Sequence, residues 1–299
     1  MTILASTSTP APEFATTSDA ISARTADGVE LSLRRVRADG PRRAVCLLTH
    51  AMMANGRYFG ALSRHFAAQG IECFALDFRG HGQSVPPHPE RGRGWCFDDY
   101  VELDLPAAIA AVCRECAIAP DELCYVGHSL GGLVGLAAFG TGTAPAPGRV
   151  WLVATSVWLP GPRGRRLRRG VMRAYLMASV PLGYAPVRAL ELGTDNEPRS
   201  YIEQLAGWAL GGRWTSRTGI DYLPFLRRVD SPVFAACGDG DRLCTDRDAR
   251  VLLDRLPGRL PLRRVGRRSG DPLDPDHFQL VTRPELARLW TEAAEFFTR

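Results

Sequence analysis

The sequence predicts an α/β fold, with a mostly parallel sheet of eight strands and helices on both faces. Short apolar segments of strand length alternate with segments of helical length along most of the chain, as in strand–helix–strand units. The first two strands read as an antiparallel hairpin around Asp27 and Gly28. The alternation stops between residues 156 and 228, so we expect an insertion there.

Apolar runs, turn residues and helix-start signals place the individual elements. The expected strands are residues 21–25, 29–37, 43–50, 71–77, 122–127, 149–154, 232–237 and 260–265. The expected helices are residues 57–69, 98–117, 130–140, 246–256 and 284–297. Thr245 or Asp246 is the expected cap of the fourth helix. In such folds the functional site lies at the carboxyl ends of the strands.

The same pattern divides the chain into three parts. Residues 1–18 are rich in Ser, Thr, Ala and Pro, a composition typical of a disordered tail. Residues 19–155 and 229–299 form the expected core. Residues 156–228 contain helical pieces, prolines and many aromatic side chains, and we expect them to form a helical insertion after the sixth strand.

Composition and charge exclude several classes of protein. The 299 residues are 45% apolar and 23% charged, as in an ordinary globular protein. All 37 basic residues are arginine, which excludes Schiff-base chemistry on lysine. The net charge of +5 has no nucleic-acid motif beside it. The arginines clustered between residues 163 and 173 fit a solvated helix surface better than a surface that steers anions.

Targeting and metal-binding signals are also missing from the sequence. No apolar run reaches the 18 residues that a membrane span needs, and the first residues do not resemble a secretory signal. The eight cysteines are scattered, without the spacing of a zinc site. We therefore expect a cytoplasmic protein that has reduced cysteines and needs no cofactor or metal.

Residues 127–131, Gly-His-Ser-Leu-Gly, are the strongest motif in the chain. An apolar strand leads into them and an apolar helix follows, so Ser129 is expected on a sharp strand-to-helix turn. Such a turn presents the serine hydroxyl clear of the backbone, and small residues at 127 and 131 permit it. The amides at the helix start point toward charge that develops on a substrate. Ser129 is therefore a candidate nucleophile.

A serine hydroxyl needs a histidine to take its proton and a carboxylate to orient that histidine. The strand at 232–237 runs into Asp239 and Asp241, and His277 follows in a loop before the last helix. Of the six histidines, only His277 lies after both of these acids. Local spacing alone leaves Asp239 and Asp241 both open.

In its order of serine, aspartate and histidine, the chain resembles the α/β hydrolases. It also carries their segment Asp-x-Arg-Gly-His-Gly-x-Ser, at residues 77–84. The resemblance extends over about residues 25 to 298. It implies that Asp241, three residues after Gly238, is the acid, and that Asp239 is a turn residue. It implies structural roles for Asp77, Arg79 and His81, and a cap over the site at residues 156–228.

The resemblance also implies an oxyanion hole made of two backbone N–H groups. One belongs to Leu130, the residue after the nucleophile. The other follows the strand at 43–50, where this chain has His-Ala-Met in place of the family's His-Gly-x. The position in this loop favours the Met52 amide as the second donor, and the amides of Ala51 and Met53 remain alternatives.

The function expected from this resemblance is that of a serine hydrolase acting on a small-molecule ester with a hydrophobic acyl group. Ser129, His277 and Asp241 would form an acyl-enzyme that water then hydrolyses. The alternative is a thioesterase or acyltransferase of secondary metabolism, acting on an acyl carrier or coenzyme A thioester. An amidase or peptidase comes next, and then a non-catalytic binding protein with this fold.

Overall fold

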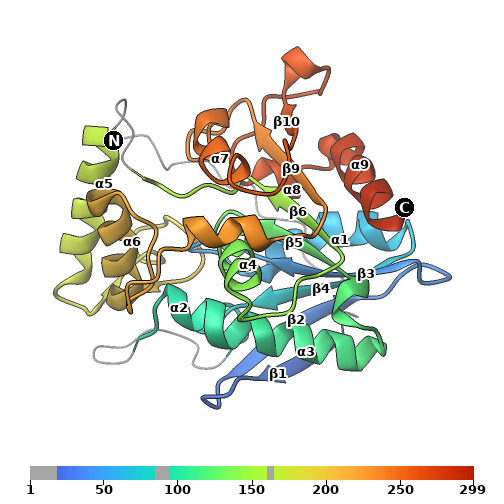
Figure 1. Ribbon diagram of the computed structural model, residues 1–299, viewed down its shortest axis with the longest axis horizontal. Coiled ribbons are helices and arrows are strands. Elements are labelled where there is room, and N and C mark those ends of the chain that lie inside the picture. The colour runs from blue at the N-terminus through green and yellow to red at the C-terminus, as the bar shows by residue number, and fades with distance from the viewer. Residues whose placement is uncertain (1–18, 85–93, 160–164) are drawn as a thin grey trace.

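The computed structural model describes residues 19–84, 94–159 and 165–299. The expected disordered tail at residues 1–18 lies outside the described residues, as does part of the arginine cluster. Figure 1 shows a central sheet with helices packed on both of its faces.

The sheet has eight strands in the order β1-β2-β4-β3-β5-β6-β9-β10. These strands are β1 Ala20–Arg24, β2 Glu30–Val36, β3 Ala44–Thr49, β4 Ile71–Asp77, β5 Leu123–His128, β6 Arg149–Val153, β9 Val233–Gly238 and β10 Leu262–Val265. β1 pairs with β2, and β2 with β4, in antiparallel fashion, and all other pairings in this sheet are parallel. The predicted fold class is therefore confirmed.

The central strands of the sheet are largely apolar, as expected for strands that helices cover on both faces. Every residue of β4 and β5 is buried. The helices are α1 Gly60–Ala67, α2 Phe97–Asp99, α3 Leu105–Cys116, α4 Leu130–Thr141, α7 Asp246–Leu253, α8 Gln279–Thr282 and α9 Ala287–Thr298. α1 packs against α9, and α3 contacts α4.

Four helices differ in detail from the expectation. The expected helix 57–69 starts as a 3-10 turn at Gly56–Phe59 (η1) before α1. The expected helix 98–117 is built from α2, a π-helical turn at Tyr100–Asp104 (η2) and α3. The expected last helix starts as a 3-10 turn at Pro284–Leu286 (η6) before α9. α8 was not expected, because four residues are too few to show helical periodicity. The expected cap at Thr245 is present, since its side chain accepts a hydrogen bond from the Asp248 amide.

Between β6 and β9 the described residues depart from the strand–helix alternation, at the place where we expect the insertion 156–228. It contains α5 Arg165–Ser179, β7 Tyr184–Ala185, β8 Glu197–Pro198, α6 Arg199–Gly211 and the 3-10 helix η4 Leu223–Arg228. α5 and α6 pack side by side, to the left of the sheet in Figure 1. The insertion meets the core at the carboxyl ends of the strands: the Thr194 amide donates to Met53 O, just after β3, and Trp158 Nε1 donates to Leu243 O, just after β9.

Candidate active site

Ser129 occupies the turn between β5 and α4 in a strained backbone conformation, with φ 52° and ψ −109°. A residue with a Cβ adopts such angles only where its surroundings hold it there. Here the Ser129 amide donates to Val153 O at 2.9 Å, and the Gly131 amide donates to His50 O at 3.0 Å. A Cβ at Gly131 would lie 2.4 Å from Thr49 O, so the turn needs the small residue that the sequence places there.

Ser129 is also the accessible point of a buried segment. All other residues from position 123 to position 140 are buried, whereas Ser129 is partly exposed. The turn therefore presents this serine toward a substrate and keeps its neighbours in the core. Strain and selective exposure together are the geometry expected of an activated nucleophile.

The structure brings Asp241 and His277 together. His277 Nδ1 lies 2.8 Å from Asp241 Oδ2, and both residues are buried. The other carboxylate oxygen of Asp241, Oδ1, accepts from the amides of Leu243 and Cys244 at 2.7 and 2.9 Å. These bonds orient the carboxylate, which in turn keeps a proton on Nδ1 and leaves Nε2 to accept one. Asp239, the alternative acid, is instead paired with Arg264.

The loop that carries His277 is fixed by the start of α8. Asp276 Oδ1 accepts from the amides of Phe278 and Gln279 at 3.0 and 2.9 Å. Among the described residues, neither Ser129 Oγ nor His277 Nε2 has a hydrogen bond, to each other or elsewhere. The His277 ring lies 5.0 Å from that of His128, the residue before Ser129.

His128 and Tyr58 support this arrangement, although neither residue was expected in the site from the sequence. His128 Nε2 donates to His277 O at 2.9 Å, and Tyr58 OH donates to His128 Nδ1 at 2.7 Å. The Ala51 amide donates to Tyr58 OH at 2.8 Å. Burial, together with the nearby His277, lowers the pKa of His128 well below its usual range, so His128 is neutral. The sequence signal for His128 was only its place at the variable position of the Gly-His-Ser-Leu-Gly turn.

The three candidate amides after β3 have different partners. The Ala51 amide donates to Tyr58 OH, and the Met53 amide donates to Glu197 Oε1 at 2.7 Å. Within the described part of the chain, the Met52 and Leu130 amides have no hydrogen-bond acceptor. The bond from the Gly131 amide to His50 O joins the start of α4 to this loop. Met52 and Leu130 are therefore the two amides left for an oxyanion.

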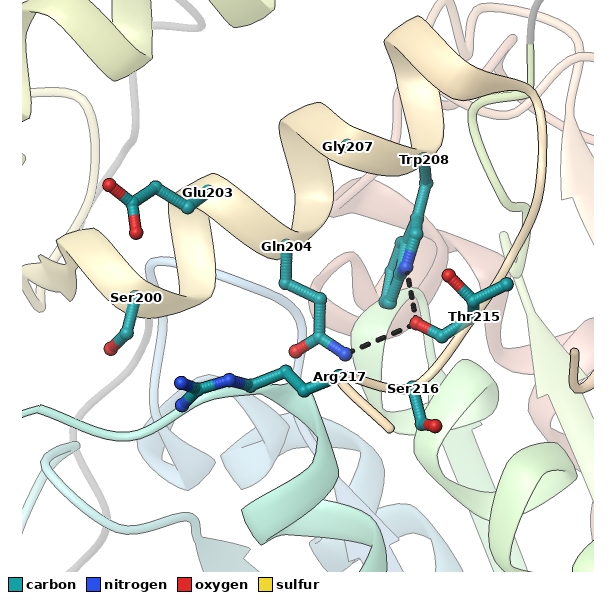
Figure 2. Close-up of a pocket in the computed structure, with 8 residues that line it drawn as sticks. All are labelled: Ser200, Glu203, Gln204, Gly207, Trp208, Thr215, Ser216 and Arg217. Carbon is teal, nitrogen blue, oxygen red and sulfur yellow. Dashed lines mark hydrogen bonds between the residues drawn. The ribbon is translucent and has the colours of Figure 1, made fainter. Parts of the chain in front are cut away.

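A cavity of about 320 Å³ lies elsewhere, against α6. Figure 2 shows it lined by residues that include Ser200, Gln204 and Arg217, and none of the residues discussed above line it. Gln204 Nε2 and Trp208 Nε1 both donate to Thr215 O. These polar groups of its wall are bonded to one another, so we do not place the active site there.

Within residues 19–84, 94–159 and 165–299, no group of three or more His, Cys, Asp or Glu side chains is arranged to hold a metal ion. In the same residues, no helix is long and apolar enough to cross a membrane.

Two curated relatives match part of the chain. The curated relative Lipase member N from Homo sapiens is 28% identical over 135 residues, and the match covers 39% of this chain and 33% of the lipase. Lipase member N from Mus musculus is 29% identical over 135 residues, and this match also covers 39% of this chain and 33% of the lipase. The chain thus spans about a third of the length of these relatives.

Solved structures resemble nearly the whole chain. An esterase from Exiguobacterium antarcticum has a TM-score of 0.64 at 13% identity, and the alignment covers 94% of this chain and 100% of the esterase. The α/β hydrolase GrgF from Penicillium sp. sh18 has a TM-score of 0.66 at 15% identity, and the alignment covers 94% of this chain and 98% of GrgF. The family model described as serine aminopeptidase S33 (Hydrolase_4) matches residues 40–196, slightly more than half of the chain. The protein therefore belongs to the serine aminopeptidase S33 family of α/β hydrolases.

Proposed function

We propose that this protein is a serine hydrolase that cleaves a carboxylic ester with a hydrophobic acyl group. The observation that carries the proposal is the strained, selectively exposed Ser129 at the turn between β5 and α4. The hydrogen bond between His277 and Asp241 supplies the matching base and acid. Esterases and a lipase among the similar proteins support an ester as the substrate.

In this mechanism Ser129 Oγ attacks the ester carbonyl carbon while His277 Nε2 takes the hydroxyl proton. Asp241 stabilises the resulting imidazolium. The carbonyl oxygen becomes an oxyanion that accepts hydrogen bonds from the Met52 and Leu130 amides. The intermediate then collapses: the C–O bond to the alcohol breaks, and His277 returns its proton to that alcohol. Water repeats the sequence on the acyl-enzyme and releases the acid.

The first test is the removal of the nucleophile. Ser129→Ala should abolish labelling by a fluorophosphonate probe and lower kcat at least about a thousandfold. Ser200→Ala is the control, because Ser200 lines the cavity of Figure 2 rather than the proposed site. Near-normal turnover by Ser129→Ala would exclude the serine mechanism.

The family description also names an aminopeptidase, but the geometry favours it less. To bind the terminal ammonium of a peptide, an aminopeptidase needs an available carboxylate. The two acids that the insertion places at Met53 are buried and already engaged with the core: Glu197 accepts from the Met53 amide, and Asp195 accepts from the Gly82 amide and Asn55. Parallel assays with p-nitrophenyl esters, acyl thioesters and aminoacyl anilides distinguish esterase, thioesterase and peptidase.

We further propose that residues 156–228 act as a cap with an apolar wall facing Ser129. Tyr175 OH lies 3.5 Å from Met53 Sδ, so α5 reaches the loop of the candidate oxyanion hole. Tyr175 and Trp158 pack on the apolar cluster between α5 and α6. This apolar arrangement suits a hydrophobic acyl group rather than a charged acyl group.

The acyl-chain preference tests the cap. Each methylene that enters an apolar pocket contributes up to about 0.8 kcal/mol, so kcat/KM should rise a few-fold per carbon until the pocket is full. The measurement is a series of p-nitrophenyl esters from two to sixteen carbons, at low and high salt. If kcat/KM does not change with the length of the acyl chain, the apolar wall is contradicted. A salt-sensitive preference for anionic thioesters would instead favour an enzyme that acts on carrier-bound acyl groups.

A further inference from the structure

The loop after β3 is held in an unusual conformation by the insertion. Met53 has a left-handed φ of 63°, which a residue with a side chain adopts only when other contacts hold it. Its amide donates to Glu197 Oε1 at 2.7 Å, and its carbonyl accepts from the Thr194 amide at 2.9 Å. Gly193 approaches so closely that a Cβ there would lie 2.4 Å from Met53 O. Both polar backbone groups of Met53 thus depend on a segment about 140 residues further along the chain.

Glu197 is in turn held by the turn after β4. Its Oε1 lies 3.2 Å from His81 Nε2, and both side chains are fully buried. His81 Nδ1 donates to Arg79 O at 3.0 Å, so both ring nitrogens serve as donors, as in an imidazolium. Burial opposes this charge, but Glu197, together with Asp195 and the Arg79 carbonyl, outweighs burial and raises the pKa of His81 to about 9. Within the described residues, Glu197 Oε2 has no hydrogen-bond partner, so Oε1 carries both contacts.

The other ionisable groups next to His81 and Glu197 do not disrupt this ion pair. The His50 ring lies 4.9 Å from that of His81. Burial, and next the charge of His81, lower the pKa of His50 to about 3, so His50 stays neutral. Asp195 accepts from the Gly82 amide at 3.0 Å and from Asn55 Nδ2 at 2.7 Å. This second carboxylate ties the same three segments together.

We propose that Glu197, held by His81, is a positioning residue that sets the direction of the Met52 N–H group toward Ser129. The proposal rests on the proposed serine hydrolase function. The Ala51 amide is anchored by Tyr58 and the Met53 amide by Glu197, so the Met52 amide lies between two fixed neighbours. Without the Glu197 acceptor, Met53 can leave its strained conformation and turn the adjacent peptide groups.

The consequence is a specific loss of transition-state binding. Removing one oxyanion donor costs about a hundred- to a thousandfold in kcat. A donor that is present but misdirected should cost less, on the order of ten- to a hundredfold. Because an oxyanion forms only during the reaction, KM should change little.

The test compares Glu197→Ala with Glu197→Gln, whose amide oxygen can still accept from the Met53 amide. Glu203→Gln is the matched control, because Glu203 is an exposed carboxylate on α6 that pairs with Arg199. For each variant we measure kcat and KM on one p-nitrophenyl ester. We also measure the affinity for an alkyl boronic acid, which forms a tetrahedral adduct with the serine. Glu197→Ala should lower kcat and weaken boronate binding by a similar factor of about ten to a hundred, with KM within about threefold. Glu197→Gln should restore most of both, and Glu203→Gln should match the wild type.

Thermal melting shows whether each variant is folded. If Glu197→Ala does not fold, Glu197→Leu replaces it with the same expectation, since leucine occupies similar volume without an acceptor. Three results overturn the proposal: unchanged kcat and boronate affinity in the variant without an acceptor, a rise in KM alone, or an equal loss in Glu197→Gln. Fluorophosphonate labelling of the wild type checks the proposed function separately, because that labelling does not depend on the outcome at position 197.

Discussion

Asp241 uses both of its carboxylate oxygens, and this determines what it can do for His277. The amides of Leu243 and Cys244 hold Oδ1, and His277 Nδ1 takes Oδ2. A carboxylate oriented in this way keeps the imidazole in the tautomer that presents Nε2 to a serine. Asp239 lies two residues away but is turned toward Arg264.

The two acids therefore differ sharply in their expected contribution. Asp241→Asn should lower kcat on the order of ten-thousandfold, because an asparagine favours the wrong tautomer of His277. Asp239→Asn should change kcat less than about threefold, since only a half-exposed arginine loses one of its two acidic partners. Steady-state kinetics on one short ester decide between them. A larger loss at position 239 would reverse the assignment of the acid.

At the scale of elements, the contact between α4 and β3 sets the distance between the two candidate oxyanion amides. A Cβ at Gly131 would lie 2.4 Å from Thr49 O, which is backbone and cannot move aside like a side chain. A Cβ at Gly132 would lie even closer, 2.0 Å from the side chain of the buried Thr155, which follows β6. Gly131 thus lets the start of α4, with the Leu130 amide, lie directly against the end of β3, and Gly132 lets it lie against the end of β6.

Substitution at Gly131 should disturb both stability and catalysis. Gly131→Ala should lower the free energy of unfolding by about 1–3 kcal/mol, as overpacking does in other cores, and it should lower kcat because the Leu130 amide shifts. Gly207→Ala is the control, since Gly207 lies in α6 with no atom within 4 Å of its added Cβ. That change should stabilise the protein by up to about 1 kcal/mol. Urea unfolding measures both effects, and a Gly131→Ala protein as stable as the wild type would contradict this packing.

At the scale of the whole molecule, a buried ion pair joins the insertion to the core. His81 lies after β4 and Glu197 begins β8, so the charge of His81 contributes to the stability of the entire fold. The pKa of His81 is raised from 6.5 to about 9 in the folded protein. The folded state therefore holds a proton that the unfolded state releases between these values. This stabilisation is complete below pH 6.5 and is lost as the pH rises through about 9.

The wild type should accordingly lose stability between pH 7 and pH 8.5 more steeply than His81→Asn, by up to about 1.4 kcal/mol per pH unit for one proton. Burial also raises the pKa of the eight cysteine thiols, so both proteins share the slope that the thiols contribute at the upper end of this range. Urea unfolding at half-unit pH intervals measures the two slopes. His81→Asn should also be less stable than the wild type at pH 7. Equal slopes in the two proteins would show that His81 is not charged in the folded protein.

The order of residues along the chain was enough to predict the sheet and the turn at Ser129. Apolar runs such as β4 and β5 must be covered on both faces, and this requirement is visible in the order of residues. The small residues at 127 and 131 are likewise a local requirement of a sharp turn. Because these constraints act between near neighbours in the chain, reading along the sequence was sufficient to find them.

The pairing of groups, in contrast, depends on contacts between distant parts of the chain. Asp241 and His277 are 36 residues apart, and spacing alone left Asp239 open. Ala51, Met52 and Met53 carry chemically identical amides, so nothing in their own residues distinguishes the candidate oxyanion donor. Tyr58 and Glu197 make the distinction by occupying two of the three amides. The reason is physical: a backbone N–H group is available to a substrate only when the fold supplies it with no acceptor.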